Sequence, residues 1–505
     1  MTIETGIVRG HVIALTAAAW GHAKCACVLL AKIVRYRSVN ATMFIGAPLY
    51  ERATKELDAQ FIPEVEDDMR RLIRVVPLEI GPNAFENSLL NANFMKEYEK
   101  LLNSKRVPFR NELPMDMVEP GPPQLVILDF FLHEILKNIR GVSGYTVPVY
   151  ALQSASVAAV LFMFGPPEIG GVYSNMEEEL NAIPRTDPNI IKKSSGRLIK
   201  IPGLPPMYDH ERAPQNFIFP ENAAPILAKA YKFFMECDGA VMNTDPMFEA
   251  PSIKVFEEWF SGRPVISVGP IDFPLIPRRE VESQTSLEVR AFLDSALHKY
   301  GSRSVVYVSF GSIFWPSEID KLRAVFEVLI EERVPFIFAH ASPFGAIPDD
   351  MKERIETSGL AYSSNWLPQT TILNHEACGW FVTHCGHNSV TEALSAGIPL
   401  VCWPFDADQP MNAANIATVH NLGYELFEVR SGIGLLPIHR LGGKTPEASI
   451  ESVKREFSGT LQKMRGQDGA VKRANAQKFR DGFAKLWAPG GENWDGIKKI
   501  TDILQ

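Results

Sequence analysis

Short, continuous apolar runs recur along this chain, with helix-like patterns between them. Three of these runs are QLVILDFF at 124–131, TVPVYALQS at 146–154 and SVVYVSFGS at 304–312. Short apolar runs without polar alternation are typical of strands that are buried on both faces of a parallel sheet. Strands that alternate with helices predict an α/β fold, because the helices then cover the two faces of the sheet.

The alternation occurs in two successive series, and the sequence changes character between them. The stretch VGPIDFPLIPRREVESQTSLE has several prolines followed by mixed charges, which is typical of interdomain connections. We expect two doubly wound, Rossmann-like domains, with a ligand cleft at the carboxyl ends of their facing strands. The predicted boundaries are 1–268 for the first domain, 269–300 for the linker, 301–480 for the second domain, and 481–505 for a helical tail that packs back towards the first domain.

The composition excludes several classes of protein. Hydrophobic residues make up 46% and charged residues 22% of the 505 residues, which is ordinary for a soluble globular protein. A net charge of -8 argues against nucleic acid as a partner, because phosphate backbones require basic surfaces. No apolar run reaches the roughly 20 residues of a membrane span. The six scattered cysteines suit a reducing compartment, so we expect a cytoplasmic protein, and a monomer is compatible with the sequence.

The segment from Phe381 to Gln409, FVTHCGHNSVTEALSAGIPLVCWPFDADQ, carries an unusual variety of polar groups. A strand ends near Thr383 and a helix begins near Asn388, so free helix N-terminal N–H groups lie at the carboxyl edge of the sheet. Such a junction binds phosphate without net positive charge. Three side chains can add hydrogen bonds to phosphate oxygens: His384, Asn388 and Ser389. Glu392 lies one turn further on the same helix face, where a carboxylate suits ribose hydroxyls.

Residues on either side of this junction suit the other parts of a nucleotide-sugar. Trp366 follows a predicted strand, and its flat face suits stacking on a nucleobase, with Gln369 placed to pair with the base edge. Asp408 and Gln409 follow the next strand and suit sugar hydroxyls. The whole region therefore predicts a nucleotide-sugar site.

A candidate general base lies in the first domain. His22 stands at the start of the helix after the first strand, where the helix N-terminus disfavours a charged imidazole, so we expect a neutral ring that accepts a proton. Asp129 ends the LVILD strand at the same sheet edge and is placed to hold the other ring nitrogen. An isolated histidine or aspartate in such places is more often structural, so the prediction depends on finding both beside the nucleotide site.

Other patterns are weaker. The HCGH sequence at 384–387 suggests zinc, but no further ligand pair follows at suitable spacing, so we expect no metal. Apolar residues of the first domain are candidates to line a pocket for a lipophilic acceptor; with one hydroxyl residue among them, they are Phe85, Phe130, Phe131, Ser154 and Phe162.

The region from Trp366 to Gln409 closely resembles the donor-binding signature of the family 1 UDP-dependent glycosyltransferases. The matching positions are Trp366, Pro368, Gln369, Leu373, His375, Gly379, Phe381, Thr383, His384, Cys385, Gly386, Asn388, Ser389, Glu392, Gly397, Pro399, Pro404, Asp408 and Gln409. Looser similarity covers most of the chain, including GHA at 21–23 and DGAVMNT at 238–244.

This resemblance implies a GT-B fold, with UDP-sugar in the second domain and an apolar acceptor in the first. It implies that Trp366 stacks on uracil, that Leu367 and Gln369 contact the uracil edge, and that Ser312 joins the diphosphate contacts. It also implies direct, inverting transfer to a small lipophilic alcohol, with His22 as base and without a metal or other cofactor. Glutamine at position 409 favours glucose. His387 departs from the family, where tryptophan is usual beside the sugar.

Three other functions are compatible with parts of the sequence. A nucleotide-sugar epimerase or hydrolase would use the same scaffold but would need no apolar acceptor pocket. A nicotinamide-dependent oxidoreductase is disfavoured, because the first strand is followed by TAAAWGH and not by a G-x-G-x-x-G turn. A binding protein without catalysis would have no need of His22 and Asp129.

Overall fold

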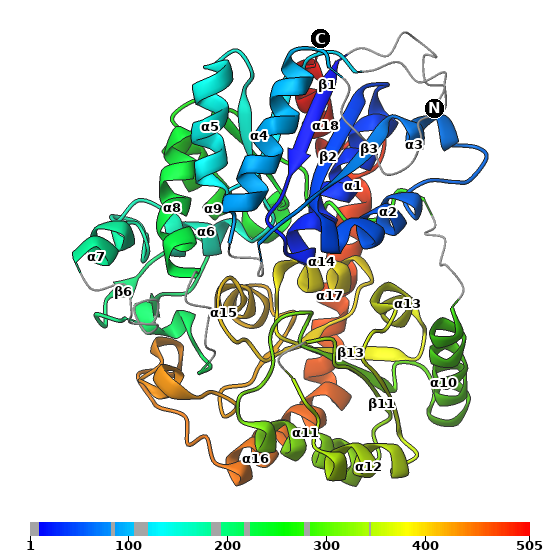
Figure 1. Cartoon of the computed structure of the whole chain (residues 1–505). Helices are drawn as coiled ribbons and strands as arrows, with labels where there is room; N and C mark the ends of the chain where they lie inside the picture. The colour runs from blue at the N-terminus through cyan, green and yellow to red at the C-terminus, as the bar shows by residue number, and fades with distance from the viewer. Residues whose placement is uncertain are drawn as a thin grey trace.

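The structure is a computed structural model of the chain. It describes residues 10–81, 86–105, 120–182, 193–216, 223–276, 283–342 and 345–504. Two parallel sheets with helices on both faces form two lobes, which lie one above the other in Figure 1. We call them the first lobe and the second lobe.

The first lobe is built on a seven-stranded sheet in the order β3-β2-β1-β4-β5-β8-β9, and all its neighbouring strands are parallel. Its strands are β1 (His11–Leu15), β2 (Asn40–Gly46), β3 (Ile73–Leu78), β4 (Leu125–Asp129), β5 (Val149–Gln153), β8 (Gly239–Met242) and β9 (Val265–Ser267). Its helices are α1 (Trp20–Tyr36), α2 (Tyr50–Asp58), α3 (Asp67–Arg71), α4 (Ser88–Leu102), α5 (His133–Ser143), α6 (Val157–Phe164), α7 (Met176–Ala182), α8 (Ala223–Glu236) and α9 (Pro246–Phe260). A short antiparallel pair, β6 (Leu198–Ile199) and β7 (Met207–Tyr208), lies outside this sheet.

The second lobe is built on a six-stranded parallel sheet in the order β12-β11-β10-β13-β14-β15. Its strands are β10 (Val305–Ser309), β11 (Phe336–Ala339), β12 (Ala361–Ser364), β13 (Cys378–Thr383), β14 (Leu400–Cys402) and β15 (Gly423–Glu425). The helices of this half of the chain are α10 (Gln284–Tyr300), α11 (Ile319–Glu331), α12 (Asp349–Thr357), α13 (Gln369–Asn374), α14 (His387–Ser395), α15 (Gln409–Ala414), α16 (Ile450–Arg465), α17 (Gln467–Leu486) and α18 (Glu492–Asp502).

Each sheet is buried on both faces, which explains the continuous apolar runs in the sequence. In β1, Val12 and Ala14 belong to the core cluster that includes α1, whereas Ile13 and Leu15 belong to the cluster on the opposite face that includes α4 and α5. Side chains along a strand alternate between faces, so a strand covered on both sides needs apolar residues at every position. The α/β architecture with two parallel sheets expected from the sequence is therefore confirmed.

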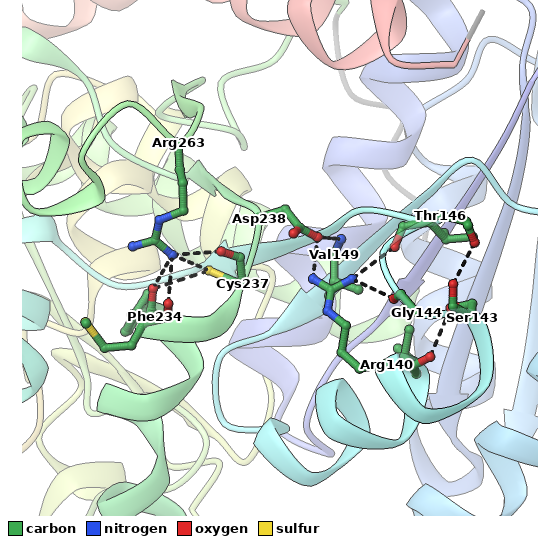
Figure 2. A network of polar contacts seen from close by, with 12 residues as sticks. Arg140, Ser143, Gly144, Thr146, Val149, Phe234, Cys237, Asp238 and Arg263 are labelled. Carbon is green, nitrogen blue, oxygen red and sulfur yellow. Dashed lines mark hydrogen bonds and ion pairs between the residues drawn. The ribbon is translucent and has the colours of Figure 1, made fainter.

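Ionic and polar contacts lie at the amino-terminal ends of the strands of the first sheet, opposite the cavity (Figure 2). Asp238, just before β8, accepts a hydrogen bond from the backbone N–H of Val149 at 2.6 Å and pairs with Arg140 of α5. Arg263 donates to the carbonyl oxygens of Phe234 and Cys237, each at 2.7 Å. These contacts hold the starts of β5 and β8 together.

The end of the chain returns to the first lobe, and α18 packs against α1 and β9 (Figure 1). The indole N–H of Trp487 donates to the carbonyl of Pro270 at 2.8 Å, and the amide of Asn493 donates to the carbonyl of Gly269 at 2.8 Å. The chain passes between the lobes once after β9 and once after α17, and these contacts join the two passages.

Some elements differ from the sequence-based expectations. The segment predicted as a linker, 269–300, contains the 17-residue helix α10, whose N-cap Ser283 accepts a hydrogen bond from the N–H of Ser286 at 3.1 Å. Most of the charges that suggested a linker, at positions 278–282, lie outside the described residues. The sequence analysis also did not identify β2, β3 or β15. Among the residues that the structure describes, no helix is long and apolar enough to cross a membrane.

Candidate functional site

A cavity of about 1040 Å³ lies between the two lobes, where the carboxyl ends of both sheets meet. The first lobe contributes Trp20, His22, Lys24 and Ser154 to its lining. The second lobe contributes every residue that was predicted to bind the donor: Ser312, Trp366, Leu367, Gln369, His384, His387, Asn388, Ser389, Glu392, Asp408 and Gln409. Residues from loops and helices far apart in the sequence thus line one space.

His22 and Asp129 form a hydrogen-bonded pair on the first-lobe side of this cavity. The distance from His22 Nδ1 to Asp129 Oδ2 is 2.7 Å, and the Oγ of Ser154 lies 3.1 Å from the same nitrogen. Asp129 is fully buried, and it also accepts hydrogen bonds from the backbone N–H groups of Ala17 and Phe131, each at 3.1 Å. Because the carboxylate accepts at Nδ1, the Nδ1 atom carries the proton and Nε2 is left with a free lone pair.

The pKa of His22 is shifted in the direction opposite to the sequence-based expectation. Burial lowers the pKa of His22, but the negative charge of Asp129 and the hydrogen bond to it raise the pKa, and the net result lies above the ordinary 6.5. We expected the helix N-terminus to keep the ring neutral. The paired carboxylate outweighs this effect, because an opposite charge in direct contact stabilises the imidazolium more than a partial dipole charge destabilises it.

The junction between β13 and α14 has the geometry predicted for an anion site. The strand ends at Thr383, and α14 begins at His387, so the helix points its N-terminus into the cavity. Cys385 has a positive φ of 66°, an uncommon conformation for a residue with a side chain. It is fully buried in the core of the second lobe.

The His384 imidazole is enclosed by two glycines in this junction. A Cβ atom at Gly311 would lie 2.8 Å from His384 Nε2, and one at Gly386 would lie 2.5 Å from the same atom. Burial lowers the pKa of His384 to about 4, so the ring is neutral near pH 7 and carries a single N–H. Only glycine at both positions leaves room for the ring beside the expected phosphate position.

Glu392 stands at the centre of a chain of polar contacts one turn into α14. Its Oε2 accepts a hydrogen bond from Gln369 Nε2 at 2.7 Å, and Gln369 Oε1 accepts one from the hydroxyl of Tyr307 at 3.2 Å. The other oxygen, Oε1, pairs with Lys24 of α1. A first-lobe cation therefore reaches the carboxylate that was predicted to hold the ribose.

The residues predicted to contact the sugar and the diphosphate are held by their neighbours. Asp408 Oδ2 accepts from the backbone N–H of His387 at 3.0 Å, and burial raises the pKa of the Asp408 carboxyl. Gln409 Oε1 accepts from the backbone N–H of Phe405 at 2.9 Å. Asn388 Nδ2 donates to the carbonyl of Gly21 at 2.8 Å, next to His22. This contact links the anion junction directly to the start of α1.

His387, which replaces the tryptophan usual in the family, contacts the first lobe. Its Nε2 donates a hydrogen bond to the backbone carbonyl of Asn243, which follows β8. The ring is 96% buried by this contact and lies at the wall of the cavity. The substitution replaces the large indole usual in the family with a smaller ring that makes a hydrogen bond between the lobes.

Trp366 is 54% exposed at the mouth of the cavity, and a first-lobe arginine covers one of its faces. The Arg52 guanidinium lies 3.9 Å from the Trp366 ring centre and 3.7 Å from the Trp20 ring centre. Both distances are within the range of cation–π contacts. The indole predicted to stack on a nucleobase is therefore already held in position by Arg52.

The residues predicted to line the acceptor pocket divide into four groups. Ser154 lines the cavity. Phe130 and Phe162 do not: they are 2% and 1% exposed and belong to the hydrophobic core under the sheet, so their assignment to the pocket was wrong. Phe131 is half-buried, and its ring centre is 5.5 Å from that of His22. Phe85 lies outside the described residues.

The sequence analysis did not single out Lys24, Arg52 or Asn243. All three come from the first lobe and contact a donor-side residue of the second lobe, so their partners are more than a hundred positions away in the sequence. Only the position of Lys24, two residues after His22, offered a signal. Among the residues that the structure describes, no group of three or more His, Cys, Asp and Glu side chains is arranged to hold a metal ion.

Two parallel sheets that face a shared cavity are the arrangement of the GT-B class of glycosyltransferase folds. Comparison with known proteins supports the same class. Residues 280–429 match the family model described as "UDP-glucoronosyl and UDP-glucosyl transferase". The UDP-glycosyltransferase eriJ of Hericium erinaceus is 29% identical, over 98% of this chain and 99% of its own. A UDP-glycosyltransferase of Stevia rebaudiana is 27% identical, over 86% of each chain.

Solved structures share the fold over nearly the whole chain. A glycosyltransferase of Medicago truncatula complexed with UDP-glucose has a TM-score of 0.69 at 19% identity, covering 98% of this chain and 99% of its own. One from Siraitia grosvenorii in complex with UDP has a TM-score of 0.68 at 20% identity, with the same coverage. This chain is similar to the family 1 UDP-glycosyltransferases, and it is a UDP-glycosyltransferase of small molecules.

Proposed function

We propose that this protein is an inverting UDP-glycosyltransferase that transfers glucose from UDP-glucose to a hydroxyl group of a small lipophilic acceptor. The observation that carries the proposal is the His22–Asp129 pair, 2.7 Å apart, which opens onto the same cavity as the N-terminus of α14. A proton acceptor and an anion site on opposite walls of one space are what direct transfer from a sugar diphosphate requires.

The donor is proposed to lie against the second lobe. Trp366 stacks on uracil, with Gln369 and the backbone of Leu367 at its polar edge. The diphosphate lies at the N-terminus of α14, where backbone N–H groups and the helix dipole favour anions; the side chains that assist are Ser312, His384, Asn388 and Ser389. Glu392 holds the ribose, and Asp408 with Gln409 holds the glucose, beside His387.

The proposed reaction is a single displacement. The acceptor hydroxyl gives its proton to His22 Nε2 as its oxygen attacks the anomeric carbon from the face opposite the diphosphate. The bond between the anomeric carbon and the phosphate oxygen breaks, and its electron pair leaves with UDP. An α-linked donor therefore yields a β-glycoside. Asp129 keeps the proton on Nδ1 and stabilises the imidazolium that forms.

The acceptor is proposed to bind on the first-lobe side. Ser154, Ala155, Leu275 and Ile276 line the cavity there and provide a mainly apolar surface. Relatives support this class of acceptor: a Phytolacca americana enzyme has been solved with UDP-2fluoro-glucose and pterostilbene, and a Zea mays relative is an anthocyanidin 3-O-glucosyltransferase. Residues 1–268 would then form the acceptor domain and 301–480 the donor domain. Free, buried thiols at all six cysteines support a cytoplasmic location.

The test is product analysis with purified protein, several UDP-sugars and a panel of phenols, terpenoids and sterols. Wild-type protein should release UDP and form a β-glucoside, and EDTA should not reduce the rate. His22→Ala should lower kcat/KM by about 10² to 10⁴-fold, the usual contribution of a general base, while the Kd for UDP stays near the wild-type value. His375→Ala is the matched control, because His375 also lines the cavity but pairs with Asp294 and has no proposed part in the reaction. Normal turnover by His22→Ala would refute the base assignment, and release of free glucose without a glycoside would indicate a hydrolase.

A further inference from the structure

Lys24 is a first-lobe cation that enters the donor side of the cavity. It lies on α1, two residues after His22, and its ammonium group pairs with Glu392 Oε1 on α14. The two side chains are 12% and 11% exposed, so the pair is largely removed from water. Because screening by salt is weak for such a pair, it is a substantial contact between the lobes.

Lys24 contacts the same carboxylate, that of Glu392, which the proposed function assigns to the ribose. Glu392 Oε2 accepts from Gln369 at 2.7 Å, while Oε1 is taken by Lys24. Neighbouring ribose hydroxyls need acceptors in the same positions. Ribose hydroxyls would therefore compete with these two partners for one carboxylate, and the lysine is the partner that belongs to the other lobe.

The ammonium group has a second anion within reach once it is displaced. Asn388 and Glu392 are one helical turn apart on α14, which is about 5.4 Å along the axis. The diphosphate is proposed to lie at the Asn388 end. A lysine side chain is long and flexible, so its charge can move over this distance without movement of α1. The described residues that line the cavity include only one other lysine or arginine, Arg290 of α10.

We propose that Lys24 acts in the transfer reaction by moving between two anions. In the empty protein it pairs with Glu392 and joins the lobes across the ribose position. When UDP-sugar binds, the ribose takes Glu392 and Lys24 moves to the diphosphate, where it stabilises the negative charge that grows as the bond to the sugar breaks. This inference rests on the donor position given in the proposed function.

The two halves of the proposal predict opposite effects on two ligands, UDP and uridine. Lys24→Met keeps the length of the side chain and removes its charge. It should weaken UDP binding about tenfold, because one charge-assisted contact to phosphate is lost. The same change should tighten uridine binding, about threefold, because uridine has no phosphate and no longer competes with Lys24 for Glu392.

The experiment measures Kd for UDP and for uridine by titration calorimetry, together with kcat for the transfer. Lys24→Arg keeps the charge and should retain most of the UDP affinity. Lys32→Met is the matched control: Lys32 is also on α1, but its ammonium donates to the carbonyl of Phe273 and lies over Trp487, so its loss should leave the ratio of the two Kd values unchanged.

An unchanged ratio of Kd values in Lys24→Met, or weaker uridine binding, would overturn the proposal. Thermal unfolding of each variant identifies a loss of folding, which would change both affinities together. Failure of the proposed function looks different: the wild-type protein itself would not bind UDP, or Glu392→Gln would bind uridine as well as wild type does.

Discussion

The buried carboxylate of Asp129 makes Asp129→Asn an informative variant, because the change alters charge and hydrogen bonding with almost no change in shape. Oδ2 accepts from His22 at 2.7 Å and from the Ala17 N–H at 3.1 Å, and Oδ1 accepts from the Phe131 N–H at 3.1 Å. An asparagine offers one oxygen acceptor and one NH2 donor. In either orientation, at least one buried N–H group faces a donor.

The expected magnitudes follow from these contacts. One unsatisfied buried N–H costs about 1 to 3 kcal/mol of folding free energy, so Tm should fall. If the asparagine NH2 faces His22, the ring proton moves to Nε2 and the base is lost. If the oxygen faces His22, the imidazolium loses its stabilising charge. Both arrangements should lower kcat/KM by about 10² to 10⁴-fold.

The assay is glycoside formation followed over pH, with UDP affinity measured separately. In the wild-type protein the rate should rise with pH as His22 loses its proton, because only the neutral ring acts as base. Asp129 raises the pKa of His22, so removal of its charge should move this rise to lower pH. The Kd for UDP should not change. A variant within about threefold of wild-type kcat/KM, or one that loses UDP binding, would refute the reasoning.

Three further changes test the donor site and the fold. Trp366→Ala should weaken UDP binding by about 1 to 3 kcal/mol, the worth of stacking a base on an aromatic ring, and a Kd within error of wild type would contradict the stacking role. Gly311→Ala should cost about 1 to 2 kcal/mol of stability, because φ is 74° and the new Cβ would lie 2.8 Å from the His384 ring; an unchanged Tm and UDP affinity would count against that close packing. Burial raises the pKa of Glu456 from 4.5 to about 7, so the contribution of this group to stability should fall by about 2 kcal/mol as pH rises through this interval. Glu456→Gln should therefore reduce the difference in Tm between pH 5 and pH 8. An identical pH dependence in the variant and the wild type would contradict this prediction.

The sequence predicts the donor side of the cavity well because its residues are close together in the chain. Trp366 to Gln409 crosses two strand ends at one sheet edge, so the local order of strand, turn and helix brings the polar residues together. His22 and Asp129 were also predicted correctly as neighbours, because both follow strands that lie side by side in a parallel sheet. The structure confirms their proximity; their catalytic role stays a prediction.

Residues that depend on the relation between the lobes were not predictable in this way. Lys24 meets Glu392, and Arg52 meets Trp366, only because two sheets face each other at a particular angle and distance. Neither hydrophobic periodicity nor spacing contains that information. The assignment of Phe130 to the acceptor pocket was wrong for a related reason. An aromatic residue next to a site residue in the sequence faces either the cavity or the core, and the residue type is the same in both cases.

The two chain segments that connect the lobes are joined by the hydrogen bond from the Trp487 indole to the carbonyl of Pro270. This bond limits how the lobes can move. Further contacts join the lobes elsewhere: the backbone N–H of Gln215 donates to the carbonyl of Phe405 at 3.3 Å, and His210 Nε2 donates to the carbonyl of Pro437 at 2.8 Å. A truncation that removes α18 would therefore disturb the junction between the lobes, even though it is made outside the cavity.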